Sequence, residues 1–234
     1  MLHGQTKYDA DGRLHGKSDP HLSDKGKGQV QEIVETVKSK GIDMILSAPH
    51  KCTMETSWII AEYLDLDESK IVKGMRIYER EFGDYEGALI SEIDVNLFTS
   101  WSANTPTPNG ETIRETAARV IPYINNMVKL LFKGKTVLII ANRHVLKVLF
   151  WYFTGLPEAG KETVAETEHC VIYEFDTENI PPEMMDSQSV LSRINPSGKP
   201  GKRNKDRILT QPEIDDIVEE IEKPRNRRSV ASNK

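Results

Sequence analysis

Residues 136–150 read TVLIIANRHVLKVLF, and this stretch carries the clearest structural signal in the chain. Thr136 to Ala141 form an almost unbroken run of aliphatic side chains, which is typical of a buried strand. A helix is expected to follow from about Val145. Because a buried strand that leads into a helix is the repeating unit of parallel α/β sheets, the stretch predicts a fold of that class.

Further strand-like and helix-like segments alternate along the chain. Short apolar runs predict strands at Ile42–Ser47, Ile71–Ile77 and Cys170–Asp176. Helical spacing and capping residues predict helices from the N-cap Ser23 to Lys38, over Met54–Leu64 and over Glu111–Phe132. In the second helix, Trp58, Ile59 and Tyr63 are expected to face inward. We therefore expect a three-layer α/β/α sandwich with a mostly parallel central sheet, which binds ligands at the carboxyl ends of its strands.

Length, charge and cysteine content exclude several classes of protein. The 234 residues suffice for one α/β domain with some excess, and the net charge of −5 disfavours a nucleic-acid partner. No apolar run reaches the length of about 20 residues that spans a membrane, so we expect no membrane partner and a cytoplasmic location. Cys52 and Cys170 are too few for a disulfide framework, and no Cys/His spacing suggests zinc, so no cofactor or metal is expected.

The composition changes near residue 176. We expect a domain over residues 1–176 and a polar, disordered tail over residues 177–234, in which Pro196–Arg207 is basic and lacks apolar periodicity. A short acidic amphipathic helix is expected at residues 210–223. Two readings of that helix stay open: a marginal element of a disordered tail, or a docking segment for a protein partner.

Four segments, in order, resemble the motifs of the histidine phosphatase superfamily, which is also called phosphoglycerate mutase-like. Its opening Arg-His-Gly corresponds to Leu2-His3-Gly4, which is followed by a loop that contains GRLHGKSD. Its later motifs correspond to SAPHKCTMET at 47–56, EREFGDYEG at 79–87 and VLIIANRHVLKVL at 137–149, and a looser Gly-Glu-Ser element corresponds to Gly110-Glu111-Thr112. The resemblance covers roughly residues 1–176 and implies the same three-layer fold.

The resemblance implies phosphoryl transfer to a histidine. His3 matches the nucleophile, and Glu79 matches the acid that protonates the leaving oxygen. Six further residues match positions of the phosphate pocket: Gly4, Asp9, Cys52, Arg80, Asn142 and Arg143. A transferring phosphoryl group carries negative charge on its oxygens, so such a pocket works mainly by positioning and electrostatic stabilisation.

This chain departs from the family pattern where that charge matters. Leu2 and Cys52 stand at the positions of two phosphate-binding arginines, and Asn142 stands at that of the second histidine. Arg143 replaces a glycine, and Asp9 replaces an asparagine. Losing three charged donors at about 1.5–3 kcal/mol each would slow transfer about 10³- to 10⁶-fold if the losses were additive.

Three functions follow from this pattern. The first is a catalytically impaired or inactive member of the family that binds a phosphorylated small molecule, a phosphorylated protein or another protein partner. The second is an active phosphatase or phosphomutase that uses His3 and Glu79 with replacement cations such as Arg80 or Arg143. The third is an interaction protein that works through its C-terminal tail.

The start of the chain raises a structural question. In the family a hydrophobic strand precedes Arg-His-Gly, whereas only Met1 and Leu2 precede His3 here. The first strand is therefore expected to be missing or truncated. Either the protein starts further upstream, or another segment fills the gap, or the strand has been lost from a decayed copy; unpaired strand neighbours would be costly when buried.

Overall fold

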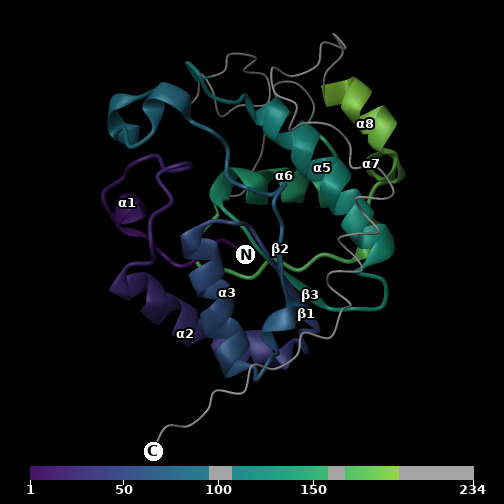
Figure 1. Cartoon of the computed structure of the whole chain (residues 1–234). Coiled ribbons are helices and arrows are strands. Elements are labelled where there is room, and N and C mark those ends of the chain that lie inside the picture. Colours follow the sequence, from purple (N-terminus) through teal and green to yellow (C-terminus); the bar gives the residue numbers. More distant parts are fainter. Residues whose placement is uncertain (95–106, 158–166, 195–234) are drawn as a thin grey trace, which may run out of the picture.

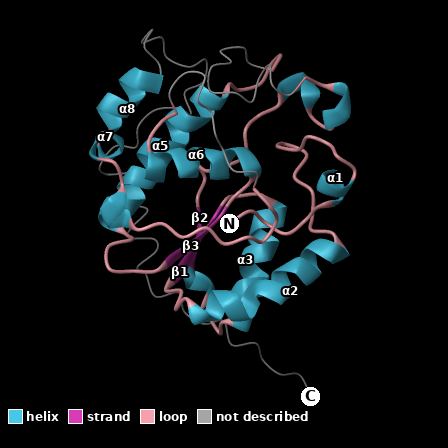
Figure 2. Cartoon of the chain, turned by 180° about the vertical axis from the view of Figure 1, so that it is seen from behind, coloured by secondary structure: helices cyan, strands magenta, loops and turns pink. Residues whose placement is uncertain are grey.

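The computed structural model describes residues 1–94, 107–157 and 167–194. Three parallel strands lie in the order β2 (Ile71–Lys73), β1 (Met44–Ser47) and β3 (Val137–Ile140). Helices α2 (Asp24–Ser39) and α3 (Lys51–Tyr63) cover one face, and α5 (Ile113–Leu130) and α6 (Arg143–Thr154) cover the other (Figure 1, Figure 2). The predicted α/β fold with a parallel sheet between helices is confirmed.

The remaining described elements are short. They are α1 (Lys7–Ala10), η1 (Glu68–Lys70), η2 (Gly83–Tyr85), η3 (Ile90–Glu92), η4 (Thr177–Asn179), α7 (Pro182–Met185) and α8 (Ser187–Ile194). Within the part of the chain that the structure describes, no helix has both the length and the apolar character that crossing a membrane requires.

Side chains alternate across the sheet and divide the core in two. Met44 and Leu46 of β1 pack in the apolar cluster formed with α5 and α6, whereas Ile45 packs in the cluster formed with α2 and α3. On β3, Leu138 and Ile140 belong to the second cluster. Because helices cover both faces, successive residues of a strand are buried on opposite sides, which explains the unbroken apolar runs in the sequence.

The first residues of the chain extend the sheet beyond β3. Leu2 forms parallel bridges to Ala141 on one side and to His169 on the other. The His3 amide donates to the Ala141 carbonyl at 3.3 Å, and the Cys170 amide donates to the Leu2 carbonyl at 3.1 Å. Residues 1–3 therefore lie between β3 and residues 169–170 and are hydrogen-bonded to both neighbours.

The strand predicted at Cys170–Asp176 does not form. Only His169 and Cys170 pair with the first residues of the chain, and residues 171–176 belong to no strand. Because the pairing is parallel, residues 171–176 would have to pair with the stretch after His3, where the Gly4 amide donates to Thr56 Oγ1 and Lys7–Ala10 form α1. An apolar run alone could not reveal that its neighbour leaves the sheet.

Helix α3 differs from its prediction in start and orientation. It begins at Lys51 rather than Met54, and Trp58 and Tyr63 are 50% and 51% exposed, so the expectation that they face inward was wrong. Cys52, Thr56 and Ile60 are buried instead. These three residues recur every four positions, so they share the helix face that packs on the sheet even though one of them is polar.

Residues 177–194 pack against the domain, which differs from the polar tail expected after residue 176. Ile180, Met184, Val190 and Ile194 are buried in the same core cluster as α5. The Asn125 side chain on α5 donates to the Met185 carbonyl at 2.8 Å. Four apolar residues spread over this segment bury enough surface to hold it on α5. The helix expected at residues 210–223 lies outside the described residues.

Candidate functional site

The residues matched to the phosphate pocket gather at the carboxyl ends of the strands. His3 follows the short first stretch, Cys52 lies in the first turn of α3 after β1, and Asn142 is the N-cap of α6 after β3. This edge is where open parallel sheets bind their ligands. Although these residues are far apart in the sequence, the strand order brings them together.

Gly4 fixes the chain immediately after His3. Its amide donates to Thr56 Oγ1 at 3.2 Å, and a Cβ placed on Gly4 would lie 2.5 Å from the Gly26 carbonyl oxygen. The loop after His3 therefore packs directly against the first turn of α2, and only glycine permits that approach.

The His3 ring is buried and held in one orientation. The side chain is 1% exposed, and Nδ1 lies 2.7 Å from the Gly4 carbonyl oxygen, so Nδ1 carries the proton and donates. Nε2 is then left with a free lone pair. Burial lowers the pKa of His3 to about 4, against the opposing charge of Asp9, so the ring is neutral near pH 7.

The substituted pocket positions contact one another or the core. Leu2 is 1% exposed and packs in the cluster of α5 and α6. Asn142 Nδ2 lies 3.8 Å from Cys52 Sγ, and burial raises the pKa of that thiol so that it stays protonated. None of these three side chains brings a positive charge to the pocket.

The two arginines considered as replacement cations have partners elsewhere. Arg80 is fully buried, and its Nε donates to the Glu111 carbonyl at 2.8 Å. Burial lowers the pKa of Arg80 to about 10, so it remains charged near pH 7. Arg143 donates to the carbonyl and hydroxyl oxygens of Thr167. Arg80 and Arg143 thus help to hold loops of the fold together.

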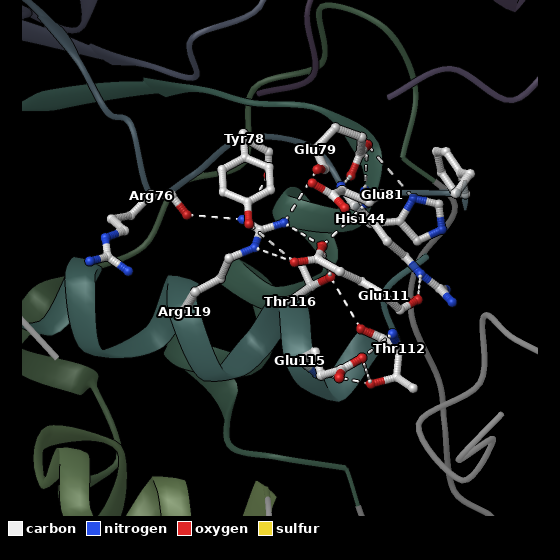
Figure 3. Close-up of polar contacts among 12 residues, drawn as sticks. Arg76, Tyr78, Glu79, Glu81, Glu111, Thr112, Glu115, Thr116, Arg119 and His144 are labelled. Atoms are coloured by element: carbon white, nitrogen blue, oxygen red, sulfur yellow. Dashed lines mark hydrogen bonds and ion pairs between the residues drawn. The ribbon is translucent and has the colours of Figure 1, made fainter. Parts of the chain in front are cut away.

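Glu79 lies in a set of donors that favours its ionised form (Figure 3). Its carboxylate accepts from the Arg80 amide at 2.7 Å and from the His144 amide at 3.1 Å, and His144 Nδ1 lies 3.6 Å away. Burial alone would raise the pKa of Glu79, but His144 and the two amides hold it at about 2. A general acid needs a raised pKa, so this carboxyl group is poorly prepared to donate a proton.

A buried arginine organises the chain around Glu79 (Figure 3). Arg119 Nε and Nη2 donate to the two carboxylate oxygens of Glu111 at 3.0 and 2.9 Å. The same guanidinium donates to the carbonyls of Arg76, Tyr78 and Glu79 and lies over the Tyr78 ring. Sequence reasoning reached Glu111 only through its resemblance to a family element and missed Arg119. The sequence feature that could have identified Arg119 is a charged residue within the apolar face of a long predicted helix.

Two further histidines and Asp9 surround the His3 ring. His15 Nε2 lies 3.1 Å from Asp9 Oδ1, and His169 Nε2 lies 3.7 Å from the same oxygen. The rings of His15 and His169 lie 5.8 and 5.5 Å from the His3 ring, centroid to centroid. Sequence reasoning named Asp9 but missed both histidines, because His15 matched no pocket position of the family motifs and His169 lies 166 positions from His3.

Comparison with known proteins assigns the family. The model of the histidine phosphatase superfamily (branch 1) matches residues 2–185, so the chain belongs to that superfamily. The 2,3-bisphosphoglycerate-dependent phosphoglycerate mutase of Parvibaculum lavamentivorans is 27% identical over 189 residues, which cover 75% of this chain and 89% of the mutase. The enzyme of the same name from Bartonella bacilliformis is 26% identical over 192 residues, which cover 76% of this chain and 92% of the enzyme.

Solved structures share the fold. A mycobacterial glucosyl-3-phosphoglycerate phosphatase in complex with VO3 superimposes with a TM-score of 0.58 at 24% identity, over 67% of this chain and 80% of that one. A protein described as mycobacterial hydrolase 2 superimposes with a TM-score of 0.61 at 21% identity, over 76% of this chain and 84% of that one. The chain is therefore a phosphoglycerate mutase-like member of the histidine phosphatase superfamily.

Proposed function

We propose that this protein is impaired or inactive in phosphoryl transfer and acts by binding a phosphorylated ligand or a protein partner. The observation that carries the proposal is the content of its phosphate pocket. Leu2, Cys52 and Asn142 stand at the positions where the family pattern has two arginines and a histidine. Without these donors, the charge on a transferring phosphoryl group is poorly stabilised.

The charge beside His3 supports the first part of the proposal, the loss of phosphoryl transfer through His3. Asp9, His15 and His169 are the charged or chargeable groups that act most strongly on the His3 ring. Burial favours the acid form of Asp9, but the hydrogen bond with His15 and the neighbouring rings hold its pKa below the usual range. The carboxylate therefore stays ionised and repels an anionic group on His3.

One feature of the pocket supports a binding role. Asn142 Oδ1 is buried and has no hydrogen-bond partner among the described residues. A buried polar atom without a partner is costly, so a bound ligand with a donor group would stabilise the site. An impaired catalytic pocket that still accepts a ligand fits this arrangement.

A second candidate function is an active phosphatase or phosphomutase that uses His3 as phosphoryl acceptor. The observation in its favour is the His3 ring, which is neutral near pH 7 and leaves Nε2 unprotonated. The ionised state of Glu79 weighs against it, because the expected proton donor lacks its proton. We therefore place this function second.

A restoration experiment tests the proposal. The full chain and the triple variant Leu2→Arg, Cys52→Arg, Asn142→His are assayed, in chelator, on a panel of phosphate esters that includes phosphoglycerates and p-nitrophenyl phosphate. We expect negligible turnover by the parent and a gain of at least about tenfold in the triple variant. Each single restoration should do little, because such residues act as a unit.

Two matched variants show whether the gain in turnover of the triple variant depends on His3 and on the arginines. Adding His3→Ala to the triple variant should abolish it, and replacing the two new arginines by lysines should keep the charge but lose the bidentate hydrogen bonds. The proposal is overturned if the parent already hydrolyses an ester efficiently and His3→Ala abolishes that activity. This outcome needs only the parent and one substitution, so it stands even if the triple variant misfolds.

A further inference from the structure

The cluster around His3 contains the donor atoms of a metal site. One atom each from His3, Asp9 and His15 lies within 4.8 Å of the other two, and the three residues are buried or half-buried. Side-chain exposure is 10% for His15 and 15% for Asp9. Imidazole nitrogens and a carboxylate, gathered in a partly desolvated position, are the usual ligands of zinc and its neighbours in the first transition row.

The orientation of two of the rings strengthens this reading. His3 Nδ1 lies 2.7 Å from the Gly4 carbonyl, and His169 Nδ1 lies 2.8 Å from the His3 carbonyl. A backbone carbonyl that accepts the Nδ1 proton leaves Nε2 as the metal-binding nitrogen, and metal-ligating histidines nearly always have such a partner.

The carboxylate of Asp9 is oriented in the same way. Its Oδ2 accepts from the amide of Thr6 at 2.8 Å and from the hydroxyl of Thr6 at 2.6 Å. Its Oδ1 is left facing His15 Nε2 at 3.1 Å and His169 Nε2 at 3.7 Å. The lone pair of His169 thus faces a carboxylate oxygen, an arrangement that is repulsive unless a cation or a proton lies between them.

We propose that His3, Asp9 and His15 bind a first-row divalent metal ion and that Zn²⁺ fits them best. His169 Nε2 supplies the fourth ligand. Three nitrogens and one oxygen match the ligand types and number of a tetrahedral zinc site, whose ligand atoms lie about 3.4 Å apart for bonds of about 2.0–2.2 Å. The donor atoms of His3, Asp9 and His15 lie within 4.8 Å of one another, so they would have to move closer together around a bound ion.

Charge selects a cation over other occupants of this position. The Asp9 carboxylate, whose Oδ1 lies 3.1 Å from His15 Nε2 and 3.7 Å from His169 Nε2, attracts a dication and repels a phosphate. The ligands come from the end of the first paired stretch, from α1, from the loop after α1 and from position 169, so they follow no spacing that a sequence motif would display. This explains why no metal was expected from the sequence.

Binding is measured on the full chain without a histidine tag, after chelator treatment and dialysis. Zn²⁺ is titrated by calorimetry, and Co²⁺ is titrated by visible absorption, which reports coordination number and any thiolate ligand. We expect one equivalent of Zn²⁺ with a Kd below about 1 μM, a rise in Tm, and a cobalt spectrum of four-coordinate nitrogen and oxygen ligands.

Variants assign the ligands. His15→Gln and Asp9→Asn should each weaken Zn²⁺ binding at least about tenfold, while His21→Gln, which alters an exposed histidine outside the cluster, should bind as the parent does. Cys52→Ser controls for binding by the nearby thiol. Absence of binding by the parent, or unchanged binding by both His15→Gln and Asp9→Asn in chains with parent-like circular dichroism, overturns the proposal and leaves a hydrogen-bonded histidine cluster.

Discussion

Two polar clusters of this molecule differ in how completely their hydrogen-bonding groups are paired. In the first, around Arg119, one guanidinium donates to both oxygens of Glu111 and to three main-chain carbonyls. In the second, around His3, the rings of His3 and His169 each use Nδ1 for a backbone carbonyl, and His169 Nε2 lies 3.7 Å from Asp9 Oδ1. The first cluster is saturated by the protein itself, and the second retains unused acceptors.

The difference separates structural from binding roles. A buried charge is tolerated when its partners are complete, and such a network fixes the chain around it. Arg119 does this for the segment that carries Glu79 (Figure 3). Unused lone pairs have no such structural value, so their presence beside His3 points to an external partner. The distinction predicts that the two clusters respond differently to substitution.

The largest effect is expected for Arg119→Met. This change leaves the Glu111 carboxylate buried without its cation and removes the donors of three carbonyls, which should lower the free energy of unfolding by about 3–5 kcal/mol. Urea denaturation measures it. Arg76→Met is the matched control, because Arg119 contacts the main-chain carbonyl of Arg76 and not its side chain. A loss below about 1 kcal/mol would contradict the structural role assigned to the cluster.

A smaller, pH-dependent effect is expected for Glu79→Gln. The amide puts a donor where two backbone amides need acceptors, so at pH 7 the variant should be less stable by about 1–3 kcal/mol. The pKa of Glu79 is lowered from 4.5 to about 2 in the fold, so its stabilising contribution is complete above about pH 4.5 and disappears as the pH falls to about 2. The two unfolding curves should therefore converge in acid.

The matched control for that profile is Glu62→Gln, which changes an exposed glutamate of α3 and should show no such convergence. If the gap between the parent and Glu79→Gln stayed constant from pH 7 to about pH 2, the carboxylate would not be the group that the two amides stabilise.

The smallest effect on stability is expected for His15→Gln in the presence of chelator. His15 makes one hydrogen bond, to Asp9, and ring-edge contacts with Tyr8 and His3, so the loss should stay within about 1 kcal/mol. Thermal unfolding followed by circular dichroism measures it. A loss as large as that of Arg119→Met would mean that the His3 cluster is also part of the structural framework.

The sequence predicted local structure well and partner-dependent structure poorly. Ser23 and the apolar run near residue 140 identified α2 and β3 because capping and burial act on neighbouring residues. Trp58 was misplaced because the partner of the helix, not its own hydrophobicity, decides which face is buried. The strand expected at Cys170–Asp176 failed for the same reason, since its extent depends on a distant stretch.

In the candidate site, too, residues recognised from local sequence motifs were predicted, and residues whose roles depend on distant contacts were not. His3, Glu79 and the substituted pocket positions were found through motif resemblance. Among them Leu2, Cys52 and Asn142 are buried, as His3 and Glu79 are. His15, His169 and Arg119 were missed because their roles arise from contacts between segments that are far apart in the chain. No local pattern records such contacts, and only the folded arrangement brings them together.

The pairing of Leu2 with Ala141 and His169 has a consequence for how the protein is made. Leu2 and His3 have hydrogen-bonding partners, Ala141 and Cys170, that are synthesised much later in the chain. Contacts of such long sequence separation form slowly and late. The ring of His3 therefore acquires its orientation near the end of folding, after both of its neighbours have emerged. Until then the growing chain carries an unpaired sheet edge, which is the kind of surface that promotes aggregation.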